Sequence, residues 1–245
     1  MNKRPSKNLL KNIRKLHRKK YRDEAGLFTV EKCKNISAYL ESGFHPRYIF
    51  ALRGVSVPST DAEIFTVDKE TLRQISTLRN PYDALAVFEM PPPAEFAEKG
   101  LIVVLDNIQD PGNLGTIIRT ADWFGIDQIL CSKDSVDVYN PKVIQAAAGA
   151  HARVKVFYDR LETRLARAGL PVYATGTDGQ NIFKTALPHD LYVMFGNEGH
   201  GLRAEIRRFA EQVLQIPHAP GKISESLNLS VSAGIVMAEW FRTSG

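Results

Sequence analysis

Two polar side chains stand out in the largely apolar stretch NIQDPGNLGTIIRTADWFG, which runs from Asn107 to Gly125. Asn113 lies in a turn that contains proline and glycine, and Arg119 follows six residues later. An amide both donates and accepts hydrogen bonds, whereas a guanidinium keeps its positive charge and presents a planar fork of donors. Such a pair suits a polar, anionic ligand.

Two further loops carry polar residues directly after an apolar run. The loop GNEGHGL contains Glu198, and the loop IPHAPGKISESLNLS contains Ser226 and Asn228. Because ligands of open parallel sheets bind beyond the carboxyl ends of the strands, we expect the three loops to converge on one site. The alternatives are that each loop is only a tight turn, that Asn228 only caps a helix, and that Arg119 only pairs with Asp122 on the helix surface.

Several familiar kinds of site are excluded by spacing. The glycines of GNEGHG stand at positions 1, 4 and 6, whereas the dinucleotide fingerprint needs 1, 3 and 6. A phosphate loop ending in GKIS would need its first glycine where Ile216 stands. The chain has no G-x-S-x-G nucleophile motif. Its six histidines lack metal-ligand spacing, so no metal site is expected.

The elements around these loops alternate between strand and helix. The run LIVVLDNI at 101–108 is apolar throughout, which is typical of a central strand in a parallel sheet. Alternating strands and helices predict an α/β fold with helices on both faces of a mostly parallel sheet. Further strands are expected at 128–132, 154–158, 171–176, 191–196 and 213–217, and helices at 116–124, 140–150, 161–169, 204–212 and 230–243.

The N-terminal segment carries the whole positive excess of the chain. Residues 1–22 hold ten Lys or Arg and no acid, so the other 22 basic and 27 acidic side chains give the remainder a net charge of −5. Leu9, Ile13 and Leu16 recur at helical spacing behind Ser6, a plausible N-cap. We expect a basic amphipathic helix that binds an anionic polymer such as nucleic acid. A solubilising tail is the alternative, and a membrane-surface helix is disfavoured because large aromatics are lacking.

The composition also bounds the domain organisation. Residues 23–90 read as a small α/β domain, the proline-rich PPPAEFAEKG at 91–100 reads as a linker, and residues 101–245 form the larger domain. The chain has no apolar run long enough to span a membrane and no signal peptide, and its two cysteines do not suggest a disulfide framework. We therefore expect a cytoplasmic protein without a membrane partner.

The three loops resemble the signature motifs of the SPOUT superfamily, and most closely those of its TrmH (SpoU) branch of RNA ribose 2′-O-methyltransferases. The motifs are DPGNLGTIIRTADWFG, FGNEGHGL and IPHAPGKISESLNLSVSAGI. The resemblance covers 101–245 and implies a deep trefoil knot and S-adenosylmethionine as cofactor. Residues 23–90 are similar, more weakly, to the family's L30e-like substrate-binding domain. By this resemblance the cofactor is bound by Thr175, Gly176, Gly196, Asn197, Glu198, Ile216, Leu227 and Asn228.

The resemblance also assigns catalytic roles. Arg119 matches an arginine that relatives are thought to use as a base, but a guanidinium holds its proton at ordinary pH. We therefore expect Arg119 to clamp an RNA phosphate and to stabilise the developing alkoxide. The other catalytic positions are Asn113, Glu198, Ser226 and Asn228, so the opening pair would serve a ribose–phosphate.

The family forms homodimers, and the apolar face of VSAGIVMAEWF fits such an interface, although a helix buried within one chain would look the same. Alternatives are an RNA-binding protein that lost catalysis and a SPOUT enzyme that methylates a base. The RNA is ribosomal or transfer RNA, with the basic arm and extra domain favouring ribosomal RNA. Two departures from the family bear on the RNA target: Lys32 replaces a usual glycine, and Asn80–Asp83 replaces a T-P-Q-G-like turn.

Overall fold

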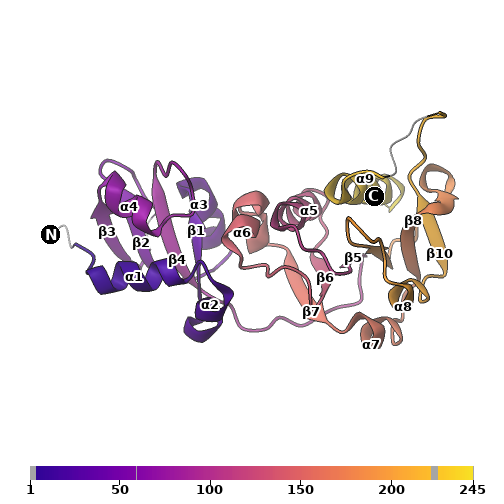
Figure 1. The fold of residues 1–245 in the computed structure, drawn as a ribbon, viewed down its shortest axis with the longest axis horizontal. Helices are drawn as coiled ribbons and strands as arrows, with labels where there is room; N and C mark the ends of the chain where they lie inside the picture. The colour runs from indigo at the N-terminus through magenta and orange to yellow at the C-terminus, as the bar shows by residue number, and fades with distance from the viewer. Residues whose placement is uncertain (1–3, 59, 222–225, 245) are drawn as a thin grey trace. The chain divides into compact units, whose positions relative to one another are not determined.

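The structure, a computed structural model, describes residues 4–58, 60–221 and 226–244, and its chain divides into two compact units (Figure 1). The N-terminal unit comprises the chain up to Pro93 together with Asp137–Ala152, and the C-terminal unit comprises Ala94–Val136 and the chain from Arg153 onward. The first division falls inside the predicted linker. The segment Asp137–Ala152 differs from the prediction, which placed it in the C-terminal domain.

The N-terminal unit is built on a four-stranded mixed sheet with the order β1-β4-β2-β3. Strands β2 and β3 are parallel, and the pairs β1–β4 and β2–β4 are antiparallel. Helix α4 begins after Asp68, whose side chain caps it by accepting a hydrogen bond from Thr71 N at 2.8 Å. The elements are β1 (Leu27–Glu31), α3 (Cys33–Glu41), β2 (Pro46–Leu52), β3 (Glu63–Val67), α4 (Lys69–Ile75) and β4 (Ala84–Glu89).

The basic arm forms a helix whose apolar side is buried in this unit. Helix α1 (Lys7–Lys15) begins after Ser6, whose Oγ accepts from Leu9 N at 3.1 Å. Ile13 and Leu16 pack into the same buried cluster as Phe50. The cations of the helix, Lys7, Lys11, Arg14 and Lys15, are exposed. The amphipathic stripe therefore holds the arm against the sheet and leaves its charge on the surface.

One cation of the arm behaves differently from the others. The predicted helix breaks after Lys15, and α2 (Lys19–Ala25) follows and ends at Gly26, where φ is +63°. Arg22 in α2 is buried, pairs with Asp137 and donates to Leu16 O at 2.8 Å. Its carboxylate partner lies 115 residues further along the chain, which no local pattern reveals.

The segment Asp137–Ala152 packs closely against α3. It contains α6 (Pro141–Ala147) and the 3-10 helix η1 (Ala150–Ala152). Gly149 has φ +92°, and a Cβ there would lie 2.9 Å from the Cβ of Ala38. Beside this contact the Tyr39 hydroxyl lies 2.8 Å from Nδ1 of His151, and both side chains are buried. Burial raises the pKa of Tyr39, so its hydroxyl stays protonated and donates to the imidazole.

His151 should make the folded state sensitive to mild acid. Burial lowers the pKa of His151 to about 4, from an ordinary value of 6.5. Between these two pH values the unfolded chain binds more protons than the folded chain, so stability falls as the pH drops below about 6.5. The full effect is about 3 kcal/mol once the pH is below 4.

Urea unfolding of the whole protein between pH 4.5 and 7.5 measures this linkage. His151→Gln keeps an acceptor for Tyr39 but does not titrate, so its stability should change less across the interval. An equal pH slope in both proteins would show that His151 is not the titrating group.

The C-terminal unit contains a six-stranded sheet with the order β10-β8-β9-β5-β6-β7, and all neighbouring strands are parallel. This confirms the predicted α/β class with a parallel sheet. Every residue of β5, β6 and β9 is buried, which explains the continuous apolar runs in the sequence. The strands are β5 (Leu101–Leu105), β6 (Gln128–Ser132), β7 (Lys155–Asp159), β8 (Val172–Asn181), β9 (Leu191–Phe195) and β10 (Gln212–Gln215).

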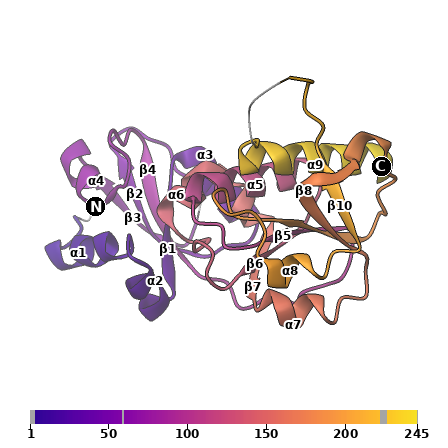
Figure 2. The same ribbon diagram turned by 45° about the vertical axis from the view of Figure 1, so that its right-hand side comes forward.

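Helices cover both faces of this sheet (Figure 2). Helices α5 (Pro111–Trp123) and α9 (Leu229–Ser244) lie side by side on one face. Helices α7 (Leu161–Leu165) and α8 (Ala204–Arg207) lie on the other, and a short 3-10 helix, η2 (Ile182–Lys184), follows β8. Alternate β5 residues, Ile102 and Val104, share a buried cluster with Leu161, Leu165 and Ile206. The trefoil knot implied by the resemblance stays a prediction.

Within the described ranges, no helix combines the length and the apolar character needed to cross a lipid bilayer.

Candidate active site

The site begins at the N-terminus of α5, directly after β5. Asp110 caps this helix because its Oδ1 accepts from Asn113 N at 2.7 Å, and Pro111 occupies the first helical position. The helix therefore starts at Pro111 and not at Thr116, and Asn113 lies inside its first turn. The carboxylate two residues before the glycine does the capping, so the amide of Asn113 is free for other contacts.

The amide of Asn113 joins the three polar loops. Its Nδ2 donates to Glu198 Oε1 at 2.6 Å, and its Oδ1 accepts from Asn228 Nδ2 at 3.1 Å. These partners are 85 and 115 residues away in sequence. Asn228 also accepts from Ser230 N at 2.9 Å in the first turn of α9. Asn228 therefore binds the N-terminus of α9 and the side chain of Asn113 at the same time.

Arg119 lies on the same helix but is not part of this chain of hydrogen bonds. Its side chain is exposed, and among the described residues it has no hydrogen bond or ion pair. The surface pair with Asp122 is absent because Asp122 binds Arg153, whose Nε and Nη2 lie 2.7 and 2.6 Å from its carboxylate. Because each residue advances an α-helix by about 100°, Asn113 and Arg119 lie about 120° apart around the axis of α5. Ser226 is also exposed.

A buried ion pair fixes the loop that leads from β5 into α5. Asp106 follows β5 directly, and its side chain is 0% exposed. Arg203 donates several hydrogen bonds to this carboxylate. Its Nε lies 2.9 Å from Oδ1, its backbone N lies 3.1 Å from Oδ2, and its Nη2 also donates to Oδ1. These hydrogen bonds raise the pKa of Arg203. The ion pair of Asp106 and Arg203 thus joins the loop after β5 to the end of the GNEGHGL loop, and no local sequence pattern predicts it.

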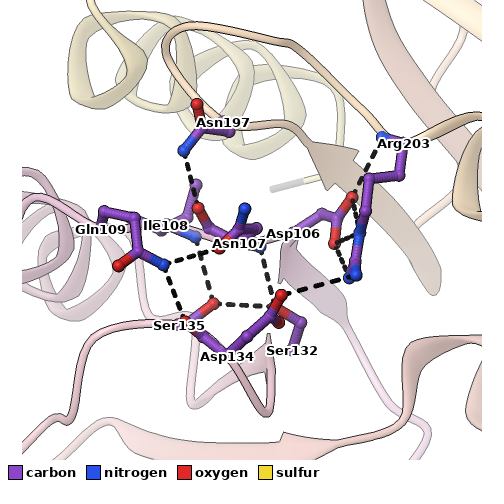
Figure 3. A network of polar contacts seen from close by, with 9 residues as sticks. All are labelled: Asp106, Asn107, Ile108, Gln109, Ser132, Asp134, Ser135, Asn197 and Arg203. Carbon is purple, nitrogen blue, oxygen red and sulfur yellow. Dashed lines mark hydrogen bonds and ion pairs between the residues drawn. The ribbon is translucent and has the colours of Figure 1, made fainter.

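Polar contacts extend from this pair to the neighbouring loops (Figure 3). Asn197 Nδ2 donates to Asn107 O at 2.8 Å, and Asn107 N donates to Ser132 Oγ at 2.8 Å. Gln109 Nε2 donates to Asp134 O at 2.7 Å. Figure 3 shows side chains from 106–109, 132–135 and 197–203 pointing toward one another. The only sequence signal for this network is an acid, Asp106, at the end of a wholly apolar strand.

The loop that carries Glu198 is a tight, closed turn. Asn197 N donates to Gly201 O at 3.0 Å, and Gly201 N donates back to Asn197 O at 2.8 Å. Gly196 has no room for a side chain, since a Cβ there would lie 2.0 Å from the carbonyl carbon of Gly201. The glycines of GNEGHG therefore shape the loop itself, and the exposed Glu198 stands at its tip.

The residues expected to bind the cofactor lie within one strand and in the loops that follow its two neighbours. Thr175 and Gly176 lie in β8, Gly196 follows β9, and Ile216 follows β10. Thr175 Oγ1 donates to Met194 O at 3.0 Å, which ties β8 to β9. The pairing of β8 with β10 shifts register between Val213 and Leu214. Leu227, by contrast, lies in the third loop with 49% of its surface exposed.

The C-terminal unit is thus an α/β protein with a parallel sheet. Its three polar loops meet where ligands of such sheets bind, beyond the carboxyl ends of the strands. The model of the SpoU rRNA Methylase family matches residues 100–238, and the model of the MRM3-like substrate binding domain matches residues 7–86. The first match covers more than half of the chain. The chain belongs to the SpoU rRNA methylase family.

Individual relatives agree with this assignment. The chain is 28% identical to the 23S rRNA (guanosine(2553)-2′-O)-methyltransferase RlmP of Bacillus subtilis, over 93% of this chain and 94% of the relative. A putative RNA methyltransferase of the TrmH family from Porphyromonas gingivalis is similar in structure, with a TM-score of 0.88, 36% identity, and coverage of 98% of this chain and 99% of that one. An AdoMet-bound rRNA methyltransferase from Sinorhizobium meliloti gives a TM-score of 0.85 and 27% identity, with coverage of 96% and 95%.

Proposed function

We propose that this protein transfers the methyl group of S-adenosylmethionine to a ribose 2′-oxygen of ribosomal RNA. The observation that carries the proposal is the hydrogen-bonded chain Glu198–Asn113–Asn228, which joins three loops of a SpoU-family fold. RlmP, which is similar over nearly the whole chain, is by name a guanosine 2′-O-methyltransferase of 23S rRNA. Methylation of the ribose is favoured over methylation of a base because the pattern of Asn113 and Arg119 resembles the ribose-methylating branch, whereas the base-methylating branch uses an aspartate as its base.

The proposal is tested by incubating the protein with unmethylated ribosomal RNA and a methyl-labelled donor. We expect label in the RNA, and alkaline hydrolysis should leave an uncleaved dinucleotide, since a methylated 2′-oxygen cannot attack the neighbouring phosphate. Label on a base would show that the protein methylates a base, like the base-methylating branch, and not a ribose. Binding of both RNA and donor without any transfer would support the inactive RNA-binding alternative.

The strand ends fit S-adenosylmethionine as the cofactor. Gly176 and Gly196 are partly exposed, and Ile216 and the exposed Leu227 supply apolar surface for an adenine ring. The carboxylate of Glu198 is exposed and complements a positively charged group. When bound, this cofactor supplies a methyl group already activated on a sulfonium. The proposed binding set is Thr175, Gly176, Gly196, Asn197, Glu198, Ile216, Leu227 and Asn228.

The residues of this chain have to position the ribose and manage its charge. When the 2′-oxygen bonds to the methyl carbon, the bond from that carbon to sulfur would break, its electron pair would remain on sulfur, and the hydroxyl proton would pass to solvent. Negative charge develops on the 2′-oxygen as this proton leaves. Arg119 is exposed and unpaired among the described residues, so it can take an RNA phosphate and stabilise this charge. Asn113 holds the ribose, Glu198 fixes the Asn113 amide, and Ser226 and Asn228 hydrogen-bond the RNA backbone. We propose these five as the catalytic set.

The cations of α1 should bind RNA phosphates. The structure rules out deletion of 1–22 as a clean test, because it would remove the buried Ile13, Leu16 and Arg22. Replacing the exposed Lys7, Lys11 and Lys15 by Gln keeps the packing. We expect weaker RNA binding and a slope of log Kd against log salt that is smaller by about 0.7–0.9 for each phosphate that the variant no longer neutralises.

The control for this experiment removes the same charge from dispersed exposed positions, Lys69, Lys155 and Lys184. Fluorescence anisotropy with one RNA at several salt concentrations gives both slopes. If the two triple variants showed the same slope, the arm would be no more than a charged surface.

We also propose that the protein forms a homodimer through α5 and α9. Trp123 at the end of α5 is 83% exposed, and Val231 and Phe241 on α9 are 49% and 51% exposed. The ring of Phe241 also lies 5.5 Å from that of Phe124, centroid to centroid, in a tilted arrangement, so the apolar surface spans both helices. Arg119 and Trp123 are four residues apart and share one side of α5, so the interface would lie beside the proposed site.

Sedimentation equilibrium tests the interface. We expect a dimer for the wild-type protein and a monomer for Trp123→Glu, because a buried carboxylate without a partner opposes association. Phe183→Glu alters another exposed aromatic, with 52% of its surface exposed, outside α5 and α9 and should leave the dimer intact. An rRNA substrate and unpaired cysteines at 33 and 131 fit a cytoplasmic location, which we propose for the assembly.

A further inference from the structure

Tyr82 presents an aromatic ring to solvent from a loop of the N-terminal unit. The loop, residues 76–83, connects α4 to β4. Tyr82 is 61% exposed, whereas its neighbour Pro81 is buried. A tyrosine with this much exposed surface has little packing to justify it. Its position in a sequence that replaces the family's T-P-Q-G-like turn makes it a feature of this chain.

Glu31 anchors the start of this loop. Its Oε1 accepts from Thr77 N at 2.8 Å and from Thr77 Oγ1 at 2.7 Å, and its Oε2 accepts from Ser76 Oγ. Leu78 N in turn donates to Ser76 Oγ at 2.9 Å. One carboxylate at the end of β1 thus holds two consecutive residues of the loop.

Asp83 anchors the other end of the loop at the start of α3. Its Oδ2 accepts from Cys33 N at 2.9 Å, so it takes the place of a capping side chain at Lys32, which makes no such bond. Lys32 N donates to Ala84 O at 3.0 Å. With both ends fixed, Tyr82 is held on a short, rigid span, and little conformational entropy remains to be lost when its ring is covered.

Lys32 has an unfavourable backbone conformation beside this loop. Its φ is +78° with ψ 129°, a region that suits glycine and that side-chain-bearing residues rarely adopt. Glycine is what the family resemblance leads us to expect at this position. This backbone conformation next to the loop is of a kind that concentrates at functional sites.

The surroundings of Tyr82 carry uncompensated positive charge. Lys32, Lys34, Arg73 and Arg79 have no carboxylate partner among the residues that the structure describes. Arg73 instead lies 3.4 Å from Arg79 O. The two acids that anchor the loop, Glu31 and Asp83, are already occupied by the hydrogen bonds that fix it. The surface therefore combines one exposed ring with several free cations.

We propose that this surface, defined by Tyr82 with Lys32, Lys34 and Arg79, binds an unpaired nucleotide of the RNA substrate. The Tyr82 ring stacks on the base, and the cations bind the flanking phosphates. The inference rests on the proposed function, in that the polymer is the RNA to be methylated. A base in a duplex is already stacked on both faces, so the surface selects a loop, bulge or other unpaired segment.

The experiment uses the whole protein and two RNAs of equal length and charge, one fully paired and one with a seven-nucleotide internal loop. Tyr82→Ala should raise Kd for the looped RNA by about 5- to 150-fold, the range for loss of one base–aromatic stack. Its Kd for the paired RNA should stay within about twofold, because phosphate contacts do not need the ring. Tyr82→Phe keeps the ring and should retain the affinity for the looped RNA.

Ile64→Ala, which trims another exposed apolar residue of the same unit, is the matched control and should change neither Kd. Equal Kd values for wild type and Tyr82→Ala on the looped RNA would overturn the proposal, and so would an equal loss on both RNAs. A loss in Tyr82→Phe as large as that in Tyr82→Ala would assign the effect to the hydroxyl and also overturn stacking. If the wild type transferred no methyl group to ribosomal RNA, the proposed function itself would fail, which is a separate result.

Discussion

Replacing Arg119 by Ala should lower kcat/KM for RNA methylation by about 10³-fold, which corresponds to about 4 kcal/mol of transition-state stabilisation. The guanidinium is exposed and has no partner among the described residues, so its removal should not disturb the packing of α5. The affinity for S-adenosylmethionine should stay within about twofold, since the proposed cofactor residues lie in β8, in the loops after β9 and β10, and before α9, and none of them lies in α5. Calorimetric titration and a single-turnover methylation assay measure the two quantities separately.

Arg119→Lys distinguishes a charge clamp from a base. A lysine keeps the positive charge but loses the planar fork, so under the clamp hypothesis it should retain a small fraction of the activity that does not depend on its deprotonation. Under the base hypothesis the activity of the Lys variant should climb steeply as the pH approaches 10, where a lysine releases its proton. Arg167→Ala removes another exposed arginine of the same unit and serves as the control. Full turnover in Arg119→Ala would remove this residue from the mechanism.

Arg203→Met should lower the free energy of unfolding by about 3 kcal/mol, because it leaves the Asp106 carboxylate buried without its countercharge. Asp106 is 0% exposed. The guanidinium of Arg203 donates three hydrogen bonds to the carboxylate of Asp106. The same change should loosen the loop from Asp106 into α5, so the affinity for S-adenosylmethionine should fall as well. Urea unfolding with and without the cofactor gives both effects.

The matched control is Arg207→Met in the neighbouring α8. Arg207 also binds a carboxylate, with Nη2 2.6 Å from Asp178 Oδ2, but both side chains are largely exposed, so we expect a loss below about 1 kcal/mol. In the Arg203→Met background, Asp106→Asn should restore part of the stability because it removes the buried charge. A loss for Arg203→Met no larger than that for Arg207→Met would mean that the buried pair is not what fixes this loop.

The two units of the structure divide the proposed work. The C-terminal unit holds the loops that would act on the ribose, and the N-terminal unit holds α1 and the Tyr82 surface that would bind RNA. The charge pairs differ accordingly: Asp106–Arg203 is buried beside the site, whereas the cations near Tyr82 are free for an external partner. The proposed RNA contacts therefore rest on residues that make few contacts within the protein.

The sequence by itself determined the order of strands and helices, because period and apolar content are local properties. The run LIVVL became the buried strand β5, and Asp68 capped α4. Motif spacing also led to the family, since DPGNLG, GNEGHG and the Asn228 loop are contiguous stretches that can be read directly. The predicted helix at 116–124 begins five residues later than α5 does. Asp110 caps α5, so the helix already starts at Pro111.

Only the tertiary structure decided which distant residues meet. The contacts of Asn113 with Glu198 and Asn228, of Asp106 with Arg203 and of Arg22 with Asp137 all join residues at least 85 positions apart. Such contacts depend on strand order and on how far each loop reaches, and neither leaves a periodic trace in the chain. The packing of Asp137–Ala152 with the N-terminal unit has the same origin: its helical pattern shows that an apolar side must be buried, but not against which partner.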